Sequence, residues 1–118
     1  MERILREVEA FLKREDVSYS YREEEDYAFK RSEGPSAVVR VKEAVSPDGK
    51  RVRVVITETF YDDTSVSYQE VVAEVYQSWR EPRRIFAVMY TGENGMPVYT
   101  NRQLFNDINR LFRMMPGD

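Results

Sequence analysis

The spacing of apolar residues changes from a helical period to a strand period within the first 21 residues, and no other feature constrains the fold as strongly. The apolar residues of the first segment share one stripe of a helix over about residues 2 to 15, and they are Ile4, Leu5, Val8, Phe11 and Leu12. Val17, Tyr19 and Tyr21 then alternate with polar residues, as in a half-buried strand. Helices and strands in one short chain predict an α+β fold.

Turn signals separate the strands that follow. The acidic run from Glu23 to Asp26 predicts the tip of a turn, and Gly34-Pro35-Ser36 precedes a strand that begins at Ala37. Ser46-Pro47-Asp48-Gly49 is typical of a tight hairpin turn. Beyond it, Val52, Val54 and Ile56 face one side of a long return strand, while Arg51, Arg53 and Val55 face the other.

The stretch from Tyr68 to Trp79 contains three valines, but its apolar residues fall at helical spacing, which predicts a second helix. Ser67 and Glu70 match a capping box at its start, and Pro82 follows its end. Strands are predicted over 85–90 and 97–99, joined by a turn at 92–95. A third helix is predicted from Thr100 or Asn101 to Pro116-Gly117.

The expected element order is therefore α-β-β-β-α-β-β-α, in a single domain spanning residues 1–118. We expect one antiparallel sheet with the helices packed on it.

Composition excludes several kinds of chemistry. The chain has no cysteine and no histidine, which removes thiolate and imidazole catalysis and His- or Cys-ligated zinc. The net charge of -3 comes from acidic and basic residues mixed along the chain. No apolar run approaches the roughly 20 residues that span a bilayer. These features favour a cytoplasmic, non-enzymatic protein without a cofactor, a bound metal or a membrane partner.

Two carboxylates keep a metal-dependent nuclease open as an alternative. Asp48 and Glu58 mimic the spaced acidic residues of the restriction-endonuclease-like nucleases, in which two carboxylates share a Mg²⁺. That family normally has a lysine two residues after the glutamate, whereas position 60 here is Phe60.

Nucleic-acid binding is a second alternative. Aromatic residues of the early strands, namely Tyr19, Tyr21, Tyr27 and Phe29, have the types that stack on bases, and Arg22, Lys30 and Arg31 lie nearby in sequence. The chain nevertheless lacks a clustered basic stripe, so that nucleic acid is not the favoured partner.

Features of the sequence point instead to a protein partner. Aromatic residues make up 13% of the chain, and Tyr and Trp are enriched at protein interfaces. Arg80, Arg83 and Arg84 cluster after the predicted second helix and suit a carboxylate-bearing or a phosphate-bearing partner equally, while the alternative explanation is simple solvation. The aromatic helices have an equally plain explanation, which is packing on the sheet.

The element order and residues 68–100 resemble the class I type III secretion chaperones and the related YbjN-like proteins. The parts that carry the resemblance are Val71 to Trp79, Arg80 to Arg84, Ile85 to Tyr90, Gly92 to Gly95 and Pro97 to Tyr99, with Arg80 where that pattern usually has asparagine. The resemblance implies a homodimer that binds a protein client. It implies a dimer contact formed by Val72, Val75, Tyr76 and Trp79. It also implies client contacts at Tyr19, Tyr21 and Val54.

Overall fold

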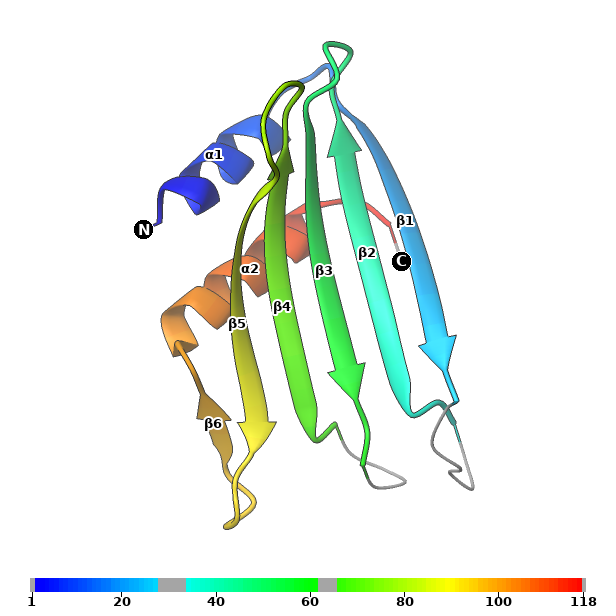
Figure 1. Ribbon diagram of the computed structural model, residues 1–118, viewed down its shortest axis with the longest axis vertical. Coiled ribbons are helices and arrows are strands. Elements are labelled where there is room, and N and C mark those ends of the chain that lie inside the picture. Colours follow the sequence, from blue (N-terminus) through cyan, green and yellow to red (C-terminus); the bar gives the residue numbers. More distant parts are fainter. Residues whose placement is uncertain (1, 28–33, 62–65, 118) are drawn as a thin grey trace.

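The computed structural model describes residues 2–27, 34–61 and 66–117. In chain order these residues form α1 (Arg3–Leu12), β1 (Ser18–Asp26), β2 (Ala37–Val45), β3 (Arg51–Thr59), β4 (Tyr68–Tyr76), β5 (Arg83–Thr91), β6 (Pro97–Tyr99) and α2 (Arg102–Met114). The strands make one six-stranded antiparallel sheet, and strands adjacent in sequence are adjacent in space (Figure 1). The predicted α+β class is confirmed.

The terminal helices and the turns at Ser46–Gly49 and 92–95 form where the sequence predicts them. Asn101 caps α2, since its side-chain oxygen accepts a hydrogen bond from the backbone N–H of Leu104 at 3.0 Å. In the turn between β2 and β3, Gly49 has a φ of +90° and donates its N–H to the carbonyl of Ser46 at 3.0 Å. A left-handed φ at this position explains the glycine.

The prediction of a central helix is wrong, because residues 68–76 form β4 in the middle of the sheet. β4 pairs with β3 on one side and with β5 on the other. Its valines are β-branched and suit a strand, and its side chains alternate between the two faces of the sheet. Ser67 does not cap a helix, since its N–H donates to the carbonyl of Thr59 at 3.0 Å and its hydroxyl accepts from the N–H of Tyr61.

The observed order is therefore α-β-β-β-β-β-β-α. The type III secretion chaperone-like order requires a helix between the third and fourth strands. The element order of the described residues consequently gives that resemblance no support, and a dimer contact formed by a second helix loses its basis.

The predicted turn at the acidic run is also wrong, because Glu23 to Asp26 continue β1 and pair with residues Arg40 to Ala37 of β2. β1 is an edge strand, so that carboxylates on it remain in water. Arg40 also lies 3.9 Å from the Glu23 carboxylate and compensates part of its charge. An edge position therefore accommodates a charge density that would not fit a central strand.

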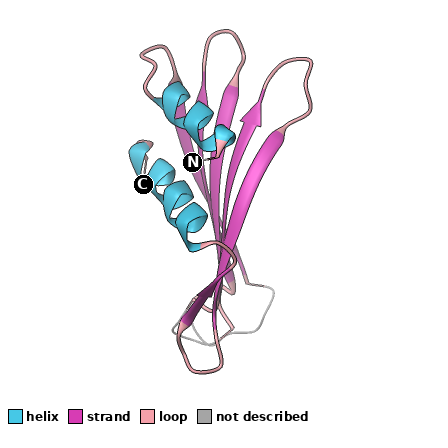
Figure 2. Cartoon of the chain, turned by 90° about the vertical axis from the view of Figure 1, so that its left-hand side faces the viewer, coloured by secondary structure: helices cyan, strands magenta, loops and turns pink. Residues whose placement is uncertain are grey.

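Both helices lie on one face of the sheet (Figure 2), and the hydrophobic core lies between the helices and the sheet. The central strands contribute small and β-branched side chains to this core, among them Val52, Val54, Val71, Ala73 and Val75. The helices contribute larger residues, among them Leu5, Phe11, Ile108 and Leu111. The opposite face of the sheet carries no helix in the part of the chain that the structure describes (Figure 1).

Two charged groups connect the helices to the sheet. The Glu7 carboxylate of α1 accepts hydrogen bonds from Arg83 at 2.8 Å and from Lys50 at 3.0 Å. These bonds, chiefly that from Arg83, lower the pKa of Glu7 from 4.5 to about 2. Lys42 of β2 is buried and donates from Nζ to the carbonyls of Phe112 and Met115, at 3.1 and 2.9 Å. It thereby satisfies carbonyls at the C-terminal end of α2.

Neither helix combines the length and the apolar character that crossing a bilayer would require, within the residues described.

Candidate binding surface

The uncovered side of the sheet, which we call the open face, is formed by the side chains of β2 to β5 that point away from the helices. Strand alternation and the observed register arrange these side chains in transverse rows. Two of the rows are central to the surface. One is charged and consists of Glu43, Arg53, Glu74 and Arg84; we call it the polar ladder. The adjacent one consists of Val41, Val55, Val72 and Phe86; we call it the apolar row.

The polar ladder alternates in charge from strand to strand. Arg53 donates to the Glu43 carboxylate from Nη2 at 3.0 Å and from Nε at 3.2 Å. Arg84 lies 3.2 Å from the carboxylate of Glu74, whose residue is only 7% exposed. Burial, the largest single influence, lowers the pKa of Arg53, but its hydrogen bond to Glu43 and the nearby Tyr76, Glu43 and Glu74 together outweigh it, so that the net direction is upward. The ladder is therefore a set of paired charges, two acidic and two basic.

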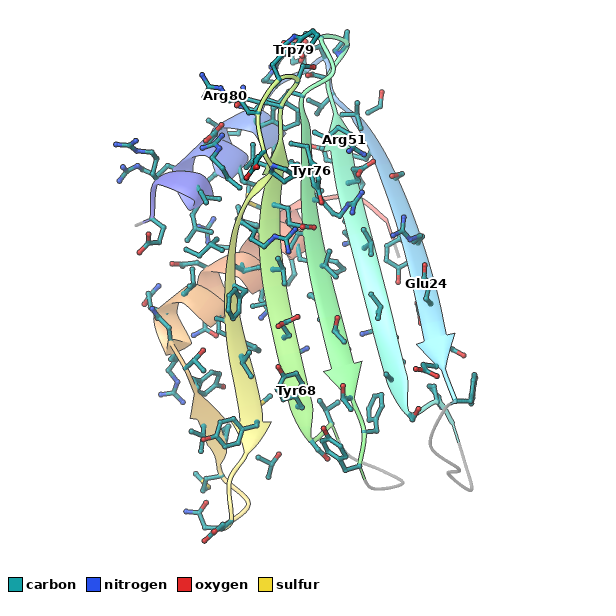
Figure 3. The ribbon with its side chains drawn as sticks, in the orientation of Figure 1. Glu24, Arg51, Tyr68, Tyr76, Trp79 and Arg80 are labelled. Atoms are coloured by element: carbon teal, nitrogen blue, oxygen red, sulfur yellow. The ribbon has the colours of Figure 1, made fainter. Side chains whose placement is uncertain are left out.

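Tyr76 adds an aromatic group beside the ladder. Its hydroxyl donates to the Glu74 carboxylate at 3.0 Å. The guanidinium carbons of Arg51 and Arg53 lie 4.7 and 5.1 Å from the centre of its ring. These distances are within the range of cation–π attraction, so that the aromatic ring and both arginines are held in one arrangement. Figure 3 shows Arg51 beside Tyr76.

The apolar side chains of the open face are unequally covered. Val41 and Val88 are buried by their neighbours, whereas Phe86 is 57% exposed and Tyr90 is 44% exposed. Tyr90 pairs with Tyr68 of β4 at the end of the sheet remote from the ladder. Two large apolar groups are thus exposed on β5, and one of them, Phe86, lies next to the paired charges of the ladder. Such a combination is typical of surfaces that contact another macromolecule.

The structure divides the residues predicted for the dimer contact into three groups. Val72 and Tyr76 lie on the open face and are partly exposed. Val75 is buried in the core beneath the helices, so that it cannot contact a partner of the folded chain. Trp79 is fully exposed in the turn between β4 and β5, away from the open face, with a φ of +68° (Figure 3).

The residues predicted for client contact all lie on the helix side of the sheet. Val54 is buried in the core. Tyr19 faces the helices, and its hydroxyl donates to the carbonyl of Leu12 at 3.0 Å. Tyr21 lies on the same side of β1, in register with the buried Lys42. None of the three residues therefore belongs to the open face.

The three arginines also point to different places. Arg80 is exposed in the turn after β4. Arg83 binds Glu7 on the helix side of the sheet, whereas Arg84 belongs to the polar ladder on the other side. They do not make a common phosphate-binding cluster.

The carboxylates of the nuclease alternative lie at opposite ends of β3. Asp48 is in the turn before this strand and accepts a hydrogen bond from Ser46, whereas Glu58 is near its far end and pairs with Arg40. The strand residues from Arg51 to Glu58 alone span roughly 24 Å, at about 3.4 Å per residue. One Mg²⁺ cannot bridge that distance. Within residues 2–27, 34–61 and 66–117 no cluster of three carboxylates has a metal-binding arrangement.

The stacking surface of the nucleic-acid alternative is only partly described. Tyr19 and Tyr21 lie on the helix side of β1 and are only partly exposed, and Phe29, Lys30 and Arg31 lie outside the described residues. A hollow of about 140 Å³ lies between the starts of the two helices, lined by Leu5, Asn101 and Leu104 among others. It is smaller than the roughly 300 Å³ at which small-molecule sites begin.

The sequence patterns do not indicate that Glu43, Glu74, Arg53 and Phe86 belong to one surface. The alternation in the return strand correctly separates Arg53 and Val55 from Val54, so part of the signal was present. The missing information was the register between strands, together with the strand character of residues 68–76, which carry Glu74.

No protein-family model, curated protein or solved structure gives a significant match to this chain. Its function is therefore inferred from the geometry of the surface itself.

Proposed function

We propose that this chain is a non-catalytic protein-binding protein and that the open face is the surface its partner covers. The observation that carries the proposal is the juxtaposition of the exposed Phe86 with the paired charges of the polar ladder, on a face where Tyr90 is also exposed farther along β5. Apolar groups supply most of the affinity when they are removed from water. Paired charges beside them supply orientation and specificity.

The charges of the open face favour a protein over a nucleic acid. The ladder contains as many carboxylates as guanidiniums, and each guanidinium already has a carboxylate neighbour. A phosphate backbone placed on it would meet Glu43 and Glu74 as well as the arginines. Nucleic-acid affinity depends on an excess of positive charge, which this row does not provide.

The same pairing argues against catalysis on this face. A general acid or base needs a titratable group that can exchange a proton with a substrate. Glu74 is buried under Arg84 and Tyr76, and Glu43 accepts from Arg53, so that both carboxylates are committed to structural contacts. The arrangement fits a surface for recognition.

A photo-cross-linking experiment in the native host tests the proposal. Benzoylphenylalanine is placed at Phe86, and in a matched control at Trp79, which is more exposed but lies outside the open face. We expect specific cross-links to protein from position 86 and few from position 79. Equal cross-linking at both positions, or none at position 86, would contradict a binding role for the open face.

A further inference from the structure

We propose that the partner covering the open face is a second copy of this chain, packed face to face about a two-fold axis that runs along the strands between β3 and β4. This inference rests on the proposed function, because it names the occupant of the same surface. Such an axis exchanges β2 with β5 and β3 with β4. The residues that it brings together follow from the observed register.

The polar ladder is self-complementary under this operation. Along the row from β2 to β5 the charges read negative, positive, negative, positive. Reversing the row reverses every sign. Glu43 of one copy therefore lies opposite Arg84 of the second copy, and Arg53 lies opposite Glu74. All four positions of the ladder meet an opposite charge, which is the condition for electrostatic complementarity in a symmetric interface.

The apolar row is complementary in size under the same operation. Phe86, the largest and most exposed member, lies opposite Val41, which is small and buried. Val55 lies opposite Val72, two side chains of equal size. Large groups opposite small ones allow the two layers to interdigitate at the roughly 10 Å spacing of packed sheets.

The row at the far end of the sheet also places large side chains opposite smaller ones. Tyr90, which is 44% exposed, lies opposite Ala37 of the second copy, and Tyr68 lies opposite Thr59. Two independent rows therefore place an exposed aromatic ring of β5 against a small residue of β2.

The other two-fold arrangement of the two faces is disfavoured. An axis across the strands places each strand against itself, so that the ladder either meets its own like charges or is shifted against a different row. Like charges repel, and a charged row placed against apolar residues leaves its groups desolvated. Only the axis along the strands satisfies the ladder and the apolar row together.

The size of the surface fits a dimer of moderate affinity. β2, β3, β4 and β5 have nine residues each. At about 3.4 Å per residue and about 4.8 Å between strands they cover roughly 600 Å² per copy, or roughly 1,200 Å² in total. This is the lower end of the range for specific interfaces, which extends from about 1,200 to 2,000 Å².

Sedimentation velocity on the full chain provides the first test, at roughly 1–100 µM, the concentrations at which an interface of this size is expected to associate. We expect the wild type to be a dimer at the upper concentrations. Phe86→Glu is expected to be a monomer throughout, while Trp79→Glu, a matched change outside the open face, remains a dimer. A monomeric wild type would overturn the inference, and so would a dimer that tolerates Phe86→Glu but dissociates in Trp79→Glu.

A charge-exchange experiment tests the position of the axis. Arg84→Glu places glutamate opposite Glu43 twice per dimer, and Glu43→Arg places arginine opposite Arg84 twice. We expect each variant alone to dimerise about tenfold or more weakly than the wild type, and an equimolar mixture to form a one-to-one heterodimer of nearly wild-type affinity. Thermal unfolding of each variant confirms that it is folded before mixing. A mixture that associates no better than the separate variants would refute this geometry.

The photo-cross-link from Phe86 separates failure of this inference from failure of the proposed function. Mass spectrometry of a mixture of isotopically light and heavy chains is expected to show a link from position 86 of one copy to the peptide containing Val41 of the other. Cross-links from position 86 exclusively to a different protein would retain the binding role of the open face and overturn self-association. Absence of any cross-link from position 86 would overturn both.

Discussion

Replacing Glu7 by glutamine is expected to destabilise the fold at neutral pH and to have a smaller effect in acid. The Glu7 carboxylate joins α1 to the sheet through Arg83 and Lys50, and its pKa of about 2 lies well below the ordinary 4.5. Glutamine keeps the shape of the side chain but removes the charge. The substitution therefore isolates the electrostatic part of this connection.

The magnitude follows from the pKa. A shift from 4.5 to about 2 corresponds to roughly 3 kcal/mol, at about 1.4 kcal/mol per unit. The Glu7 side chain remains 23% exposed and Arg83 35% exposed, so that solvent screens part of the attraction. We therefore expect Glu7→Gln to lower the free energy of unfolding by about 1–2 kcal/mol at pH 7.

The pH dependence has a definite sign. Because the pKa of Glu7 is lower in the folded chain than in the unfolded one, its stabilisation is complete above pH 4.5 and is lost as the pH falls toward about 2. The difference between wild type and Glu7→Gln should shrink over that interval.

Urea denaturation at several pH values between 7 and 3 measures this difference without adding salt that would screen the charges. Glu15→Gln, a change at an exposed acidic residue just beyond α1, serves as the control and should leave the midpoint unchanged at every pH. The reasoning would be refuted by a Glu7→Gln variant as stable as the wild type at pH 7, or by a destabilisation of equal size at pH 7 and pH 3.

Two other substitutions probe further features of the fold. Lys42→Met leaves the carbonyls of Phe112 and Met115 without their Nζ donor, so that the free energy of unfolding in urea should fall by about 1–3 kcal/mol. Lys13→Met, at the exposed residue that follows α1, should be nearly neutral. Trp79→Gly relieves a non-glycine residue at a φ of +68° and should raise the free energy of unfolding by up to about 1 kcal/mol, measured by thermal unfolding. Trp79→Ala removes the ring but keeps Cβ, and an equal gain in that variant would show that the backbone conformation is not the cause.

The amino-acid sequence by itself determined the parts of this fold whose signals are local. The stripe of α1, the Asn101 cap of α2 and the turn that needs Gly49 each depend on interactions within a few residues. The absence of histidine and cysteine likewise removed whole classes of chemistry, because composition alone decides whether an imidazole or a thiolate can be present.

Only the tertiary structure decided that residues 68–76 form a strand and which residues make up the open face. Val71, Val72 and Val75 fit one stripe of a helix. Val71, Ala73 and Val75 equally fit one face of a strand, so the local pattern is compatible with both structures. The hydrogen bonds that favour the strand come from β3 and β5, which precede and follow β4 in the chain, so the pattern within residues 68–76 alone does not reveal them. The same long-range register brings Glu43, Arg53, Glu74 and Arg84 into one row, and spacing within any single segment carries no information about it.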